Sequence, residues 1–168
     1  MDSRYIMPFV KSVQNVFETM LQLPVQVSAP ELKTGSPTYD VSAIIAMSGD
    51  VDGSVVLSFP TATAERAIAL FSGRPLASGS PDFADAVGEL VNMISGGAKA
   101  QFPGKQVSIS CPSVVVGHDH IVQGQKDAVC ILIPCACDCG EFAIEVRFKR
   151  VGSAAPTAAP EQPAAAAG

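Results

Sequence analysis

Residues 80–101 read Ser-Pro-Asp-Phe-Ala-Asp-Ala-Val-Gly-Glu-Leu-Val-Asn-Met-Ile-Ser-Gly-Gly-Ala-Lys-Ala-Gln and carry the clearest helix signal in the chain. Ser80 is suited to cap this helix, and Pro81 fits its first position, where the missing N–H leaves no hydrogen bond unmade. At about 100° per residue, the apolar side chains fall within roughly 80° of one another and predict a core-facing side: Phe83, Val87, Leu90, Ile94 and Ala98. The stretch therefore predicts a long amphipathic helix that ends before Pro103.

The opposite side of this helix carries what we call the polar ridge: Asp85, Glu89, Asn92, Gly96 and Lys99. A solvated helix face is the ordinary explanation of such a ridge. Two features favour a further role. Asn is a poor residue for a helix interior, because its amide competes for backbone hydrogen bonds. Each glycine of the Gly96-Gly97 pair also costs about 1 kcal/mol relative to alanine. A helix that lets another protein's backbone approach closely would use such glycines.

The flanking sequence predicts the remaining helices and strands by its apolar spacing. Steps of three and four residues predict a first helix with one apolar stripe: Ile6, Phe9, Val10, Val13, Val16, Phe17, Met20 and Leu21. A second helix is expected over 61–71. Strands are expected at 24–29, 39–48, 54–59, 106–109, 113–117, 128–134 and 141–149. This order predicts an α+β fold, a mostly antiparallel sheet with long helices packed against it.

The 168 residues are expected to form one folded domain over residues 1–151, followed by a tail. From Gly152 the chain contains prolines, alanines and no large apolar side chain. Nothing in this stretch offsets the entropy lost on ordering it. We therefore expect residues 152–168 to be disordered.

Composition excludes several classes of function. Eleven Lys and Arg against 16 Asp and Glu give a net charge of −5, which argues against a nucleic-acid groove, where clustered cations are needed. No apolar run reaches the roughly 18 residues of a membrane span, and no secretory signal is evident at the N-terminus. Five cysteines, an odd number, indicate thiols in a reducing compartment. We expect a cytoplasmic protein.

The motif Asp85-x-x-x-Glu89-x-x-Asn92, followed by Gly96, resembles the signature of the CheC/CheX/FliY family of chemotaxis phosphatases. Further segments resemble CheX-like proteins in the same order along the chain: Tyr5-Ile-Met-Pro-Phe9, Val16-Phe-Glu-Thr-Met20, Tyr39-Asp-Val41, Ser48-Gly-Asp-Val51, Gly53-Ser-Val-Val-Leu-Ser-Phe59 and Pro112-Ser-Val-Val115. The resemblance covers nearly all of the chain up to Arg150 and implies a CheC/CheX-like fold. Gly97 departs from the pattern, which often has Asn at this position.

The resemblance implies a protein phosphatase that hydrolyses the phospho-aspartate of a CheY-type receiver domain, in chemotaxis or related two-component signalling. Glu89 and Asn92 would be the catalytic residues. The Asn92 amide can orient a water, since it both donates and accepts hydrogen bonds, and Glu89 would reach a lysine of the receiver. Asp85, Gly96 and Lys99 are possible docking residues. The resemblance also implies that Mg²⁺ belongs to the receiver, that this chain binds no cofactor, and that it forms a homodimer by extending its sheet edge to edge.

Two other interpretations remain open at this point. The same ridge could dock a receiver without accelerating phosphate loss. Alternatively, Cys135-Ala-Cys137-Asp-Cys139 and His118-Asp-His120 could bind zinc. Zinc sites usually place two residues between cysteines rather than one, so we expect no metal. The two histidines are expected in a solvated polar loop, and Cys111 and Cys130 are expected to be small buried hydrophobic residues.

Overall fold

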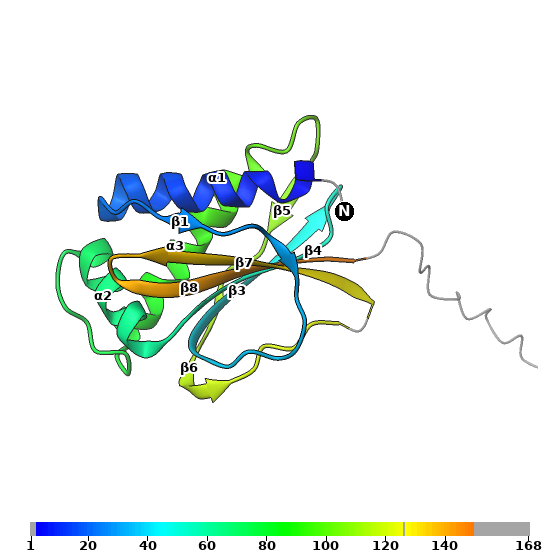
Figure 1. The fold of residues 1–168 in the computed structure, drawn as a ribbon. Helices are drawn as coiled ribbons and strands as arrows, with labels where there is room; N and C mark the ends of the chain where they lie inside the picture. Colours follow the sequence, from blue (N-terminus) through cyan, green and yellow to red (C-terminus); the bar gives the residue numbers. More distant parts are fainter. Residues whose placement is uncertain (1–2, 126, 150–168) are drawn as a thin grey trace, which may run out of the picture.

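The computed structural model of the chain describes residues 3–125 and 127–149 (Figure 1). The buried apolar side chains of these residues form one core. The predicted tail, residues 152–168, lies outside the described residues, so the domain boundary at residue 151 stays a prediction.

The helical elements are η1 (Ser3–Tyr5), α1 (Met7–Val16), η2 (Phe17–Leu21), α2 (Thr61–Ser72) and α3 (Pro81–Lys99). As predicted, Pro8 lies in the first turn of α1. The apolar stripe was wrong at Met20, whose side chain is 43% exposed. The reason is that η2 is a π-helical turn, in which the Gln22 N–H donates to the carbonyl of Phe17. This wider turn advances by a smaller angle per residue, which rotates Met20 away from the core.

The strands form one antiparallel sheet in the order β1-β7-β8-β4-β3-β5, with β2 also paired to β7 and β6 also paired to β3. Their bounds are β1 Gln26–Val27, β2 Glu31–Leu32, β3 Tyr39–Gly49, β4 Gly53–Phe59, β5 Val107–Ile109, β6 Ser113–His120, β7 Ala128–Cys137 and β8 Gly140–Lys149. The predicted α+β class and the hairpin of β3 and β4 are confirmed. Strand β2 was not predicted, and β6 runs three residues beyond its predicted end.

One face of the sheet packs against the helices. Alternate side chains of β3, β4 and β8 fill this side of the core: Val41, Ala43, Ile45, Val55, Leu57, Phe59, Ile144 and Val146. Helices α1 and α3 pack against each other over it, and α2 lies at one end (Figure 1). In the described part of the chain, no helix combines the length and the apolar character needed to cross a membrane.

The opposite face of the sheet is also partly covered. Segments 33–36 and 121–125 lie over it, held by hydrogen bonds from Lys33 and Arg147. Glu145 is buried on this face, and so are Ser42 and Ser58, whose hydroxyls are hydrogen-bonded to each other at 2.8 Å. A simple alternation of core-facing and solvent-facing residues does not describe this sheet.

Candidate functional site

Helix α3 is held in place at its start and along its inner side. The N–H of Phe83 donates to Ser80 Oγ at 3.2 Å, and the Ser80 hydroxyl donates to the carbonyl of Ala77 at 2.8 Å. These bonds confirm the predicted cap. The predicted core face is confirmed as well, since Phe83, Val87, Leu90, Ile94 and Ala98 are all fully buried. The helix therefore presents its outer residues from a rigid base.

Contact with α1 explains one of the two adjacent glycines. Ser12 of α1 donates its hydroxyl to the carbonyl of Ile94 at 2.7 Å. A Cβ at Gly97 would collide with this hydroxyl oxygen. Gly97 is thus required by the close approach of α1. At Gly96, by contrast, an added Cβ would meet nothing within 4 Å. Only Gly96 remains open toward solvent or a partner.

The polar ridge lies on the outer side of α3, as the helical spacing of its residues predicted. Asp85, Glu89 and Lys99 are exposed, and Asn92 is half-buried. Within residues 3–125 and 127–149, no side-chain hydrogen bond or ion pair engages any of these four residues. The ridge therefore offers two carboxylates, a carboxamide and an ammonium group that are all free to meet a partner.

The segment between β5 and β6 borders the ridge. A Cβ at Gly88 would lie 3.1 Å from Pro112 Cγ, so the absent side chain lets Pro112 pack on α3 one residue before Glu89. Cys111, which precedes this proline, is exposed. The prediction of a buried Cys111 was therefore wrong, because the chain leaves the sheet between β5 and β6 at this residue.

A hollow of about 650 Å³ continues from the far end of the ridge. It lies between the end of α3 and β5, and its lining includes Gly96, Lys99, Lys105 and Ile109. Lys105 was not among the site residues predicted from the sequence. Periodicity relates residues within one helix, whereas Lys105 reaches the hollow from the loop after it. No local signal in the sequence indicated that contact.

The expectation that the histidines lie in a loop is wrong, whereas the expected exposure is confirmed for His118. Both belong to β6, and His120 Nε2 is 2.8 Å from Ser42 Oγ while Nδ1 is 2.8 Å from the carbonyl of Gly117. His118 is exposed and lies 3.5 Å from Asp40. The tertiary contact with Ser42 on β3 orders a segment whose own composition is that of a loop.

The cysteines are free thiols that differ in burial. Cys135 and Cys139 are buried, and Cys130 and Cys137 are half-buried. Burial raises the pKa of Cys135 to about 12 and that of Cys139 to about 11. Among the residues described, no three His, Cys, Asp or Glu side chains gather in a way that could hold a metal ion. The geometry thus draws attention to the ridge rather than to the cysteines.

Comparison with known proteins identifies the family of the chain. The family model "Chemotaxis phosphatase CheX" matches residues 41–136, which include the whole of α3. The CheY-P phosphatase CheX of Thermotoga maritima is 29% identical over 130 residues, covering 71% of this chain and 79% of that protein.

Solved structures show the same fold. A CheC-like superfamily protein from Shewanella sp. PV-4 is 30% identical, with a TM-score of 0.81 over 89% of this chain and all of the other. The CheX chain of a CheX–CheY–BeF3–Mg²⁺ complex from Borrelia burgdorferi is 19% identical, with a TM-score of 0.74 over 87% of this chain and 98% of that one. With the family model spanning more than half of its residues, the chain belongs to the CheX family of chemotaxis phosphatases.

Proposed function

We propose that this protein is a phosphatase that removes the phosphoryl group from the phospho-aspartate of a CheY-type receiver domain, in chemotaxis or related two-component signalling. The observation that carries the proposal is the polar ridge. Glu89 and Asn92 lie one turn apart on a helix with a fixed core face, and among the described residues their side chains make no hydrogen bond or ion pair that would have to be broken. Membership of a phosphatase family supports the same activity.

The chemistry needs little from the phosphatase itself. An acyl phosphate is already activated, so hydrolysis requires a water held in line with phosphorus and charge neutralisation for the leaving carboxylate. Asn92 is suited to hold the water, because its amide can donate one hydrogen bond and accept another. The reaction adds water across the acyl phosphate and releases aspartate and inorganic phosphate. No covalent intermediate on this chain is required.

Glu89 is proposed as the docking anchor of the site. Its exposed carboxylate can pair with a cation in the receiver's active site and so position Asn92 over the phosphoryl group. Asp85, Gly96 and Lys99 are proposed to border the docked receiver. Gly96 suits this role because an added Cβ would meet nothing within 4 Å, so the receiver can approach the helix closely there. Lys99 and the neighbouring Lys105 supply positive charge beside a substrate rich in negative charge.

Mg²⁺ is proposed to come with the receiver rather than with this chain. The Borrelia complex holds CheX and CheY together with BeF3 and Mg²⁺. On the present chain, the ridge carries one carboxamide and two carboxylates that face solvent, a set suited to docking. The cytoplasm is the proposed location, since the described cysteines are all free thiols.

A homodimer joined through β6 is the proposed assembly. Within residues 3–125 and 127–149, this strand pairs only with β3, lies at the edge of the sheet and is the longest of the edge strands. Val115 and Val116 on it are 40% and 42% exposed. An exposed apolar edge strand is a template for pairing with a second chain. Light scattering should show a dimer. Val116→Lys should weaken this dimer, whereas Leu70→Lys, at an exposed position of α2, should leave it intact. A monomeric wild type would overturn this assembly.

The decisive experiment follows the decay of a phosphorylated CheY-type receiver in the presence of Mg²⁺ and catalytic amounts of this protein. We expect faster decay, which Asn92→Ala slows by about a hundredfold or more through loss of water positioning. Asn15→Ala, at an exposed position of α1, is the matched control and should retain full activity. Glu89→Gln should raise KM by about tenfold or more through loss of an ion pair, whereas Glu141→Gln should not.

The same experiment separates catalysis from docking alone. Receiver binding with unchanged decay would identify a docking module and overturn the phosphatase proposal. Activity that survives Asn92→Ala would overturn the assignment of the water-positioning residue.

A further inference from the structure

A cluster of charged side chains is buried on the sheet face that the helices leave uncovered. The side chain of Glu145 is 1% exposed, and it lies between those of Lys33 and Arg147, which are 10% and 7% exposed. Glu145 Oε1 is 2.7 Å from Lys33 Nζ, and Oε2 is 2.6 Å from Arg147 Nη2. Across the described ranges, 3–125 and 127–149, no other carboxylate pairs with either cation. The cluster therefore holds an excess positive charge where unpaired charge is costly.

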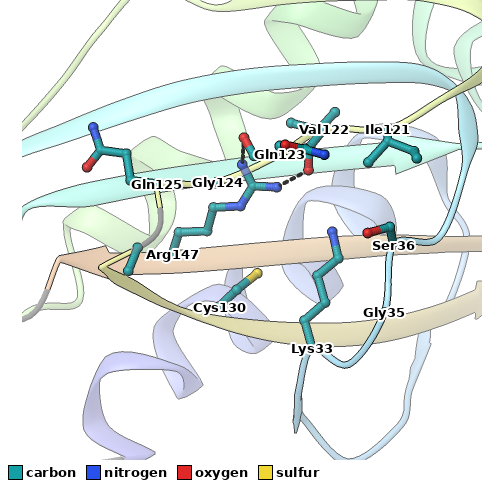
Figure 2. A pocket seen from close by; sticks show the side chains of 11 residues that line it. Lys33, Gly35, Ser36, Ile121, Val122, Gln123, Gly124, Gln125, Cys130 and Arg147 are labelled. Atoms are coloured by element: carbon teal, nitrogen blue, oxygen red, sulfur yellow. Dashed lines mark hydrogen bonds between the residues drawn. The ribbon is translucent and has the colours of Figure 1, made fainter.

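A hollow of about 240 Å³ adjoins this cluster, between segments 33–36 and 121–125 and the strands β7 and β8. Figure 2 shows the side chains of Lys33 and Arg147 reaching toward it from separate parts of the chain. Its lining as described includes the Ser36 hydroxyl and no carboxylate. Cys130 adds no negative charge, because burial raises the pKa of its thiol. The hollow is smaller than the pockets that hold drug-sized ligands, and its charge favours a small anion.

One donor of Arg147, its Nε, has no acceptor in the described part of the chain. Its Nη1 donates to the carbonyl of Gln123 at 3.2 Å, and its Nη2 donates to the carbonyl of Val122 at 2.7 Å and to Glu145. The buried Nε has no hydrogen-bond partner among the described residues. Buried donors are nearly always satisfied, so an unpaired guanidinium N–H in a cationic hollow indicates a missing acceptor.

Gly124 keeps the space beside this donor open. A Cβ at Gly124 would lie 3.2 Å from Arg147 Nε and 3.1 Å from Cδ. Any side chain larger than hydrogen would therefore press on the guanidinium and narrow the hollow. The unpaired donor, the excess positive charge and this glycine coincide in one place.

We propose that the hollow binds a small oxyanion, a carboxylate or phosphate of a few heavy atoms, which accepts hydrogen bonds from Arg147 Nε and Lys33 Nζ. The Lys33 ammonium has donors to spare beyond its bond to Glu145. The bound anion balances the second cation and ties segment 121–125 to β8. No residue of the polar ridge lines this hollow, so the site is separate from the proposed phosphatase site.

The test is a titration of the full-length protein with sodium acetate and, separately, with sodium phosphate, at constant ionic strength kept by sodium chloride. The Nε–H resonance of Arg147 in a ¹⁵N spectrum is the readout, which does not depend on phosphatase activity. We expect a saturable shift with at least one of the two anions. Saturation by acetate alone identifies a carboxylate site, and saturation by phosphate alone or by both identifies a broader oxyanion site.

Two variants with matched controls test the assignment. Gly124→Ala should weaken anion binding by about tenfold or more because it narrows the hollow. Lys33→Met should weaken binding by a similar factor because it removes a charged donor. Gly79→Ala, which has open space around it, and Lys11→Met, at an exposed position of α1, should bind the anion as the wild type does. Gly124→Ala keeps both cations, so the test remains valid if Lys33→Met fails to fold. A linear shift, or binding that both variants leave unchanged, overturns the proposal.

Discussion

Replacing Gly97 with alanine tests how α1 is packed on α3. The new Cβ would collide with Ser12 Oγ and would lie 3.4 Å from Ser12 Cβ. Ser12 is 2% exposed, and its hydroxyl is held by the 2.7 Å bond to the carbonyl of Ile94. The hydroxyl cannot turn aside without losing this bond. The substitution must therefore shift α1 relative to α3 or break the bond.

The expected loss follows from two opposing effects. Inserting a methyl group into a packed helix contact costs about 1–3 kcal/mol. Replacing glycine with alanine inside a helix returns about 0.5–1 kcal/mol. The net destabilisation of Gly97→Ala therefore lies between about 0 and 2.5 kcal/mol. At about 1 kcal/mol, near the middle of this range, the Tm of a domain of this size falls by about 2–4 °C.

Urea unfolding of a double-mutant cycle measures this contact directly. The four proteins are wild type, Ser12→Ala, Gly97→Ala and the double variant. Ser12→Ala removes the oxygen that collides, so Gly97→Ala should be neutral or stabilising in that background. The coupling free energy between the two sites should then be about 1 kcal/mol or more. Equal losses from Gly97→Ala in both backgrounds, or a gain in the wild type, would refute the packing argument.

Three further predictions concern separate parts of the molecule. Gly96→Ala should stabilise the fold by about 0.5–1 kcal/mol in urea unfolding, because the added Cβ meets nothing within 4 Å. The same substitution should raise the KM for the phosphorylated receiver. An unchanged KM would remove Gly96 from the docking surface. Hydrogen bonds from two backbone N–H groups lower the pKa of Asp40 from 3.8 to about 2. The contribution of Asp40 to stability is therefore complete above pH 4 and is lost as the pH falls through 2. Asp40→Asn should flatten the dependence of stability on pH between these values, and an unaltered acid profile would contradict this. At pH 8, a thiol reagent should label exposed Cys111 first and buried Cys135 and Cys139 last, as followed by mass spectrometry. The reason is that burial raises the pKa of Cys135 to about 12 and that of Cys139 to about 11. Early labelling of Cys135 would contradict its buried position.

The signals that could be interpreted from sequence are those that act over a few residues. Ser80 and Pro81 mark the start of α3 because capping is a contact between neighbours in the chain. The two-residue period of β3 and β4 predicts their hairpin, since side chains alternate along any strand. The polar ridge follows from the same kind of arithmetic, because residues three and four apart share one side of a helix. Whether Glu89 and Asn92 perform catalysis is a prediction that the receiver assay decides.

The sequence alone thus determined where α3 lies, which of its sides is buried, and which polar residues it presents. Tertiary structure decided what covers each surface. The helical spacing placed Gly96 on the polar ridge and Gly97 off it, but only the structure shows that α1 approaches Gly97. Glu145 alternates with core residues as a solvent-facing residue would, yet segments 33–36 and 121–125 bury it with its two cations. The physical reason is that periodicity specifies the side of an element on which a residue lies, whereas burial depends on segments distant in the chain that come to rest there.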